Sequence, residues 1–141
     1  MTPEAQIQSS LILWWQYAYK GFGVTDARAL FHVPNGAYFG NEIRTLGSGK
    51  RVSMGAIRFH NLKKQGFVQG VPDLLLIVPS NGKAGLALEL KAPHGRLSID
   101  QGQMLHLFEA CGWAHCIAWS LDEAVGAITR YLKSGNPLKA T

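Results

Sequence analysis

The sequence predicts an α/β domain with a central mixed sheet and helices on both of its faces. Three observations lead to this fold class. Segments with helical spacing alternate with short apolar runs along the chain, and two of these runs follow each other around a tight turn. The chain has 141 residues, 47% of them apolar and 16% charged, which is enough for a core of its own. We expect one domain over residues 1–134 and a flexible tail over residues 135–141.

The first part of the chain predicts a helix and then a strand. The segment Thr2-Pro3-Glu4 is typical of a helix start, because it offers a capping hydroxyl, an early proline and an acid near the positive end of the helix dipole. Gly21 and Gly23 end this helix. Residues 29–33 predict a short strand that ends at the turn Pro34-Asn35-Gly36. The apolar positions of the helix recur at intervals of three and four: Ile7, Leu11, Trp14, Trp15 and Ala18.

The next segment predicts a flexible basic loop and a helix. The sequence Gly47-Ser48-Gly49-Lys50 resembles part of a P-loop, but that motif needs Gly at position 44 and Ser or Thr at position 51, and both positions are Arg. We therefore interpret it as a loop without phosphate-cradling geometry. A helix capped by Ser53 then runs to Gln65 and ends at Gly66. Its apolar residues are predicted to face inward: Met54, Ile57 and Leu62.

The second half of the chain predicts a hairpin, a helix, a strand and a last helix. Residues 73–78 and 86–92 are expected to form two buried strands that the turn at 80–83 folds back on each other. Ser98 and Gln101 form a capping box for a helix that runs to Ala110. Residues 113–119 form the last strand, and a second capping box at residues 120–123 opens a helix that runs to Leu132.

The hairpin carries three charged residues to one end of a buried sheet. Asp73 opens its first strand, and Glu89 and Lys91 lie two positions apart on the second, so strand alternation places both on the same face. Two carboxylates are costly to bury unless a cation compensates their charge, and a divalent metal ion beside a phosphate would do so. The alternative is that Asp73 ends a turn and that Glu89 and Lys91 form an exposed ion pair on an edge strand.

At these positions the sequence resembles a nuclease family. Pro72-Asp73 followed by Glu89-Leu90-Lys91 is similar to the PD-(D/E)xK motif. The wider set, Gly70-Val71-Pro72-Asp73-Leu74, Leu88 to Lys91 and Gly95 to Gln101, resembles the VRR-NUC branch, with His32 to Gly36 and the first helix adding to the likeness. This resemblance implies a restriction-endonuclease-like core with a basic insertion after the first strand. It also implies DNA hydrolysis that leaves a 5′-phosphate, branched substrates such as flaps or four-way junctions, and a homodimer.

The charges and the resemblance together suggest a role for each candidate. We expect Asp73 and Glu89 to bind one Mg²⁺ or Mn²⁺ with the Leu90 carbonyl, and Lys91 to lie beside the attacking water and the phosphate. In the resembling family a glutamate of the first helix completes the metal site, which points to Glu4, although Glu4 is equally explained by the helix dipole. Gln101 either contacts the catalytic water or lysine, as in similar nucleases, or serves only its capping box.

The basic residues are concentrated in one segment. Between residues 41 and 66 there are six Lys or Arg against the single acid Glu42, a balance of +5 that equals the net charge of the whole chain. A basic segment beside a cation site favours nucleic acid as the partner, whereas a merely solvated surface is the alternative. The residues expected to contact the DNA backbone are Lys50, Arg51, Arg58, Lys63 and Lys64.

The sequence therefore predicts a metal-dependent, structure-specific DNA endonuclease. Its rivals are a catalytically silent DNA-binding protein on the same scaffold and a partner-interaction domain. No apolar run reaches the length of a membrane helix, so we expect no membrane partner and a cytoplasmic protein, in a bacterial host cell if it is phage-encoded. Cys111 and Cys116 are expected to be reduced core residues. A zinc site made from them with His106 and His115 lacks the usual paired spacing.

Overall fold

The structure is a computed structural model that describes residues 1–34 and 40–133. The predicted turn at Asn35 and Gly36 and the predicted tail at 135–141 lie outside the described residues. Two short 3-10 turns, Tyr19–Phe22 and Ala27–Ala29, follow the first helix. The helices and strands, in chain order, are α1 (Pro3–Ala18), β1 (Leu30–His32), β2 (Ile43–Thr45), β3 (Arg51–Ser53), α2 (Met54–Lys64), β4 (Leu74–Leu76), β5 (Leu86–Leu90), α3 (Ile99–Ala110), β6 (Ala114–Ala118) and α4 (Leu121–Lys133).

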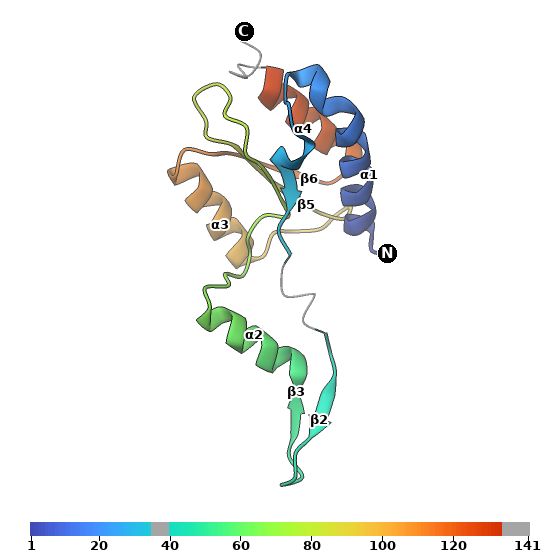
Figure 1. The fold of residues 1–141 in the computed structure, drawn as a ribbon, viewed down its shortest axis with the longest axis vertical. Coiled ribbons are helices and arrows are strands. Elements are labelled where there is room, and N and C mark those ends of the chain that lie inside the picture. Colours follow the sequence, from blue (N-terminus) through green and yellow to red (C-terminus); the bar gives the residue numbers. More distant parts are fainter. Residues whose placement is uncertain (35–39, 134–141) are drawn as a thin grey trace.

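The central sheet is mixed, as predicted. Its strand order is β1-β4-β5-β6, with β1, β4 and β5 antiparallel in turn and β6 parallel to β5. Helices α1 and α4 lie together on one side of this sheet and α3 lies on the other (Figure 1). Every residue of β5 is buried, because this strand has a neighbour on each edge and helices over both faces. The charged residues at the end of β5 therefore belong to a strand that is buried along its whole length.

Residues 41–66 form an arm that projects from this body (Figure 1), and here the sequence prediction was partly wrong. The expected loop is a hairpin in which β2 pairs with β3, Ile43 opposite Ser53, and the Leu46 N–H donates to the Lys50 carbonyl at 2.7 Å. The three-residue strands are too short to show a period-2 pattern in the sequence. The insertion does follow the first strand, as predicted.

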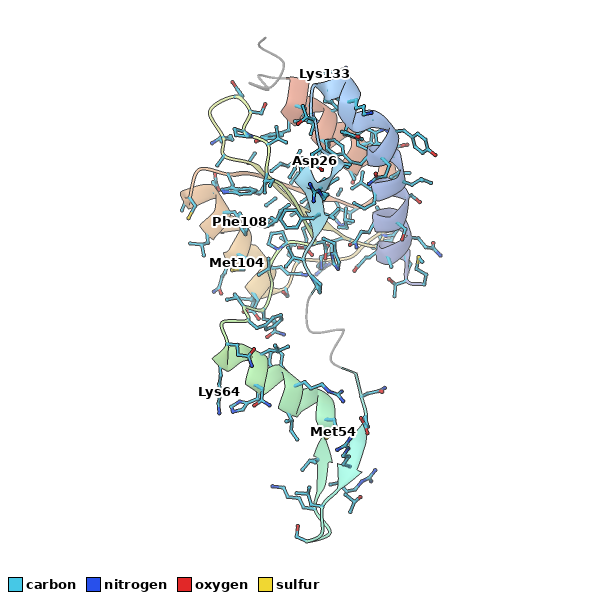
Figure 2. The ribbon with its side chains drawn as sticks, viewed as in Figure 1. Asp26, Met54, Lys64, Met104, Phe108 and Lys133 are labelled. Atoms are coloured by element: carbon cyan, nitrogen blue, oxygen red, sulfur yellow. The ribbon has the colours of Figure 1, made fainter. Side chains whose placement is uncertain are left out.

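The apolar residues of α2 do not face a core, contrary to the prediction. Of the three residues predicted to face inward, Ile57 is 40% exposed, Leu62 is 36% exposed and Met54 is half-buried. Gly55 is the buried residue of this helix. The reason is that α2 belongs to the arm, where no second layer covers it (Figure 2). The predicted start at Ser53 is correct, since its hydroxyl accepts the Ala56 N–H at 3.1 Å.

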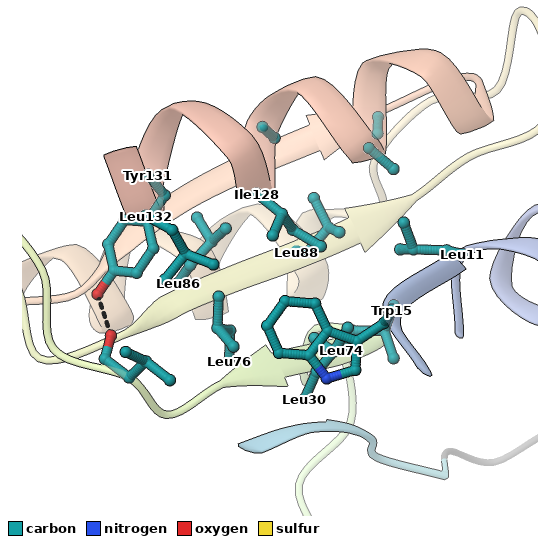
Figure 3. Close-up of a cluster of buried hydrophobic side chains, with 14 of the residues drawn as sticks. Leu11, Trp15, Leu30, Leu74, Leu76, Leu86, Leu88, Ile128, Tyr131 and Leu132 are labelled. Atoms are coloured by element: carbon teal, nitrogen blue, oxygen red, sulfur yellow. Dashed lines mark hydrogen bonds between the residues drawn. The ribbon is translucent and has the colours of Figure 1, made fainter. Parts of the chain in front are cut away.

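The hydrophobic core lies between the sheet and the pair α1 and α4 (Figure 3). Its largest side chain, Trp15, is fully buried, and the indole N–H donates to the Ala27 carbonyl at 2.8 Å, which satisfies the polar atom. Cys116 is half-buried on β6, but Cys111 is exposed just after α3, so the expectation that both are core residues was wrong for Cys111. No helix among the described residues is long and apolar enough to cross a membrane.

The far end of the hairpin is tied to α4 by two buried hydrogen bonds. The Tyr131 hydroxyl donates to the Val78 carbonyl at 2.6 Å (Figure 3), and the Ser80 hydroxyl donates to the Tyr131 carbonyl at 2.6 Å. Burial raises the pKa of Tyr131 to about 12, so this phenol is a neutral donor throughout the usual pH range. The two bonds hold the β4–β5 hairpin from the end opposite to its charges.

We expect Tyr131→Phe to lower the free energy of unfolding by about 1–2 kcal/mol, because it leaves the buried Val78 carbonyl without its donor. Urea unfolding followed by circular dichroism measures this change. The matched control is Tyr17→Phe, whose side chain is 84% exposed and which should leave stability unchanged. Equal stability of the two variants would contradict a structural role for the Tyr131 hydroxyl.

Candidate active site

The β4–β5 pairing brings Asp73 to the charged end of β5. Asp73 comes directly before β4, and the antiparallel register pairs Leu74 with Leu88, so the start of β4 adjoins the end of β5. The Asp73 Oδ2 atom accepts the backbone N–H of Leu90 at 2.8 Å. The predicted convergence of the hairpin charges is therefore present in the geometry.

Glu89 and Lys91 lie on the same face, as strand alternation predicted. The distance from Lys91 Nζ to Glu89 Oε1 is 3.9 Å, and the two side chains are only 10% and 2% exposed. β5 is not an edge strand, because β4 and β6 pair with it on either side. The alternative of an exposed ion pair on an edge strand is therefore wrong.

Gln101, in the first turn of α3, joins the helix start to these charges. Its Oε1 atom accepts the Ser98 N–H at 2.9 Å, which completes the predicted capping box, and also accepts from Lys91 Nζ at 2.8 Å. Its amide Nε2 donates to Glu89 Oε1 at 2.9 Å. The two roles that the sequence left open are thus compatible, because one amide caps the helix and contacts both charged side chains.

Burial sets the protonation of the two carboxyl groups. Burial, and after it the neighbouring Asp73 carboxylate, raise the pKa of Glu89 to about 8, while Lys91 opposes the shift. Burial also raises the pKa of Asp73, against the lowering effect of the Leu90 N–H. Among the described residues Glu89 Oε2 is the one buried side-chain oxygen or nitrogen without a hydrogen-bond partner. The pair is short of positive charge and of donors.

The neighbouring carboxylates of Asp73 and Glu89 repel each other when both are ionised, and a hard divalent cation, which prefers oxygen ligands, would relieve this repulsion. Asp73 and Glu89 could hold the cation with the Leu90 carbonyl, and Glu4 lies nearby, since its Oε1 accepts the Ala92 N–H at 3.3 Å and its charge raises the pKa of Asp73. However, the described residues contain no group of three or more His, Cys, Asp or Glu side chains placed to hold a metal. The zinc alternative lacks such a group, and a cation at Asp73 and Glu89 needs backbone or water oxygens as further ligands.

His32 contacts the site in a way that the sequence did not predict. Its ring Nδ1 lies 2.8 Å from the Asp73 carbonyl oxygen, and because a carbonyl can only accept, Nδ1 carries the proton and donates. The Val33 N–H donates to the same carbonyl at 2.9 Å. No local pattern in the sequence signals this contact, because the pairing of β1 with β4 links positions 41 residues apart.

Gly70 anchors the loop before Asp73 against the first turn of α3. Its φ of +88° is a conformation that side chains other than glycine rarely adopt, and a Cβ at this position would lie 2.7 Å from the Asp100 carbonyl carbon. Asp100 is the neighbour of Gln101 in the sequence. The close approach therefore positions the Asp73 loop relative to the helix that carries the glutamine.

The predicted DNA-binding residues all lie on the arm, apart from the carboxyl cluster. Lys50 follows the hairpin turn, Arg51 is on β3, and the other three are on α2. Arg58 forms an ion pair with Glu42 at 3.3 Å, and Lys63 Nζ lies 5.1 Å from the centre of the Phe59 ring. Figure 2 shows Lys64 at the end of α2 nearer the body and Met54 at the end farther from it. The structure thus separates a basic arm from an acidic buried cluster.

The fold is a mixed α/β domain with a restriction-endonuclease-like core. The family model of the VRR-NUC domain matches residues 2–118, and the chain therefore belongs to this family of nucleases. A solved structure described as a VRR-NUC domain protein is similar, with a TM-score of 0.70 and 16% sequence identity over 96% of this chain and 93% of that chain. That likeness supports the fold. Comparison with curated proteins gave no match.

We expect Gly70→Ala to lower the free energy of unfolding by about 3 kcal/mol, because both backbone strain and the clash with Asp100 oppose a side chain there. The control is Gly66→Ala. Gly66 also has a positive φ, +99°, but nothing lies within 4 Å of the place that an added methyl group would take, so strain alone should cost about 1 kcal/mol. Urea unfolding of both variants separates the two effects, and equal losses would contradict the role of the close approach.

A pH dependence follows from the raised pKa of Glu89. The unfolded chain loses this proton near pH 4.5, whereas the folded protein keeps it to about pH 8, so the free energy of unfolding falls as the pH rises through this window. We expect Glu89→Gln, measured in a chelator, to remove part of this fall. Between pH 5 and pH 8 the variant should lose less free energy of unfolding than the wild type, by on the order of 2 kcal/mol. Asp122→Asn, at an exposed carboxylate of the first turn of α4, is the control and should keep the wild-type slope. An unchanged slope in Glu89→Gln would contradict the assignment.

Proposed function

We propose that this protein is a metal-dependent, structure-specific DNA endonuclease that hydrolyses phosphodiester bonds of branched DNA, such as four-way junctions or flaps. The observation that carries this proposal is the buried cluster at the end of β5, in which Glu89, Lys91 and Gln101 contact one another and Asp73 binds the Leu90 N–H beside them. Membership of the VRR-NUC family supplies the nuclease class. Unbalanced carboxylates supply the reason for a cation, and Mg²⁺ or Mn²⁺ suits oxygen ligands.

Each side chain of the cluster has a distinct task in this proposal. Asp73 and Glu89 would hold the cation, with the Leu90 carbonyl and Glu4 as further oxygen ligands. When bound, a divalent cation polarises the scissile phosphate and lowers the pKa of the attacking water. The Lys91 ammonium orients that water and stabilises the negative charge that develops on the phosphate. Attack on phosphorus breaks the bond to the 3′-oxygen and leaves a 5′-phosphate and a 3′-hydroxyl.

Gln101 acts as a positioning residue in this scheme. Its single Oε1 atom accepts from both the Ser98 N–H and the Lys91 ammonium, so the capping box fixes the place of the lysine head group. The amide N–H groups meanwhile hold Glu89 on the other side. A long, flexible lysine side chain is thereby kept in one conformation before substrate arrives, which reduces the entropy lost in the reaction.

The arm is the proposed contact with the DNA backbone. It contains all of the net positive charge of the chain, and phosphate contacts by Lys or Arg do not depend on base sequence. The proposed contacts are Lys50, Arg51, Arg58, Lys63 and Lys64. A homodimer would place two arms and two clusters around one branched substrate, which suits paired cuts on a symmetric junction.

We expect Lys91→Ala to lower the cleavage rate by at least about 100-fold while DNA binding persists, because the variant loses charge stabilisation but keeps the arm. Asp73→Asn should behave alike. The measurement is cleavage of linear, flapped and four-way DNA with Mg²⁺, Mn²⁺ or a chelator, beside a binding titration. Lys83→Ala, at an exposed lysine of the opposite turn, is the matched control and should cut normally.

The rival functions give different results in the same experiment. A wild-type protein that retains DNA but cuts none of the three substrates with either cation is a silent DNA-binding protein. A protein that neither retains DNA nor responds to salt is an interaction domain, because binding through phosphate contacts weakens steeply as salt rises. Cleavage by Lys91→Ala at the wild-type rate would remove the proposed mechanism.

A further inference from the structure

A groove of about 350 Å³ lies next to the proposed active site. The start of α1 lines one side of it, and Pro93 and the segment 119–121 line the other. Glu4 lies on α1 between the lining residues Pro3 and Gln6, and its carboxylate accepts the N–H of Ala92, the residue between Lys91 and Pro93. The groove therefore meets the proposed site at Glu4 and at the residues that follow Lys91, whereas none of Asp73, Glu89 and Lys91 lines it.

Trp119 presents a fixed aromatic ring to this groove. Its indole N–H donates to the Gly95 carbonyl at 2.8 Å, and its backbone N–H donates to Glu123 Oε2 at 2.6 Å. All four tryptophans of the chain are among the described residues, and Trp119 is the exposed one, at 38%. An aromatic ring that is held in place yet left partly bare loses little entropy when a flat partner packs on it.

The lining of the groove selects the chemistry of that partner. None of its side chains is charged: three are rings, Pro3, Pro93 and Trp119, and the polar ones are the neutral Gln6, Ser10 and Ser120. A phosphate or carboxylate would find no cation there, whereas a flat heterocycle would find ring surfaces for its faces and amide or hydroxyl groups for its edge.

We propose that this groove binds one unpaired base of the DNA substrate, stacked on Trp119, in the nucleotide next to the scissile phosphate. A base inside a duplex is stacked between its neighbours and cannot enter a groove in a protein surface. The groove therefore selects DNA with an unpaired nucleotide at the cut, as at a flap, a frayed end or an opened branch point. This inference rests on the proposed DNA cleavage and specifies its substrate.

The test compares flapped DNA that carries an abasic site, placed in turn at each unpaired position, with the intact flap. We expect one abasic position to lower wild-type kcat/KM about tenfold, mainly through KM, because stacking of a base on an aromatic ring contributes to binding. Trp119→Ala should lose about the same factor on the intact flap and nothing further on that abasic flap. Trp119→Phe, which keeps a ring but lacks the indole N–H, should stay within about threefold of wild type.

Tyr17→Ala is the matched control, since Tyr17 is an 84% exposed aromatic residue of α1 outside the groove. This variant should cut the intact flap and each abasic flap at the same rates as the wild type. A wild-type protein indifferent to every abasic position would overturn the inference. So would a Trp119→Ala variant that loses equally on intact and abasic flaps, because that result indicates a structural role. In both cases the wild type still cuts DNA, so the proposed function survives.

If the wild type cuts no DNA, the proposed function fails and the groove is tested by binding alone. Tryptophan fluorescence is then titrated with a short unpaired oligonucleotide and with the same backbone lacking its bases. Quenching by the first and not by the second, present in wild type and lost in Trp119→Phe, supports the base site. The absence of that difference overturns it.

Discussion

The hydrogen bond from the Leu90 N–H to the Asp73 carboxylate is the contact on which the site depends. It crosses from the start of β4 to the end of β5 and places one carboxylate beside the buried Glu89. Ionisation of two neighbouring carboxyl groups away from water is energetically unfavourable, and burial therefore raises the pKa values of Asp73 and Glu89. A folded protein without cation therefore holds a proton that a bound cation would displace.

Several separate elements supply the partners of this pair. The first turn of α3 contributes Gln101, and β1 contributes His32, which binds the Asp73 carbonyl. The close approach of Gly70 to Asp100 positions the loop that precedes Asp73. Each of these contacts also stabilises the fold: Gln101 completes a helix cap, and His32 joins two strands. The contacts that order the carboxyl cluster are therefore also contacts of the fold, and substitution of either residue should disturb both.

Local patterns in the sequence predicted much of the body and the core of the site. Apolar runs and strand alternation placed Glu89 and Lys91 on one face, and the Ser98 capping box located Gln101, because these features depend on neighbours in the chain. Contacts between distant segments were not predictable in this way, as for His32 and Asp73. The prediction that apolar residues of α2 face inward was wrong for Ile57 and Leu62, because spacing alone does not reveal whether a core lies opposite. The prediction that Cys111 is a core residue was wrong for the same reason.

The arm is built so that it depends little on the body. Its strands are three residues long, and α2 buries only Gly55. Substitutions there should change the free energy of unfolding only slightly, since little apolar surface is lost. The charge and length of this extension can therefore change while the buried cluster stays intact, so related chains should diverge fastest here.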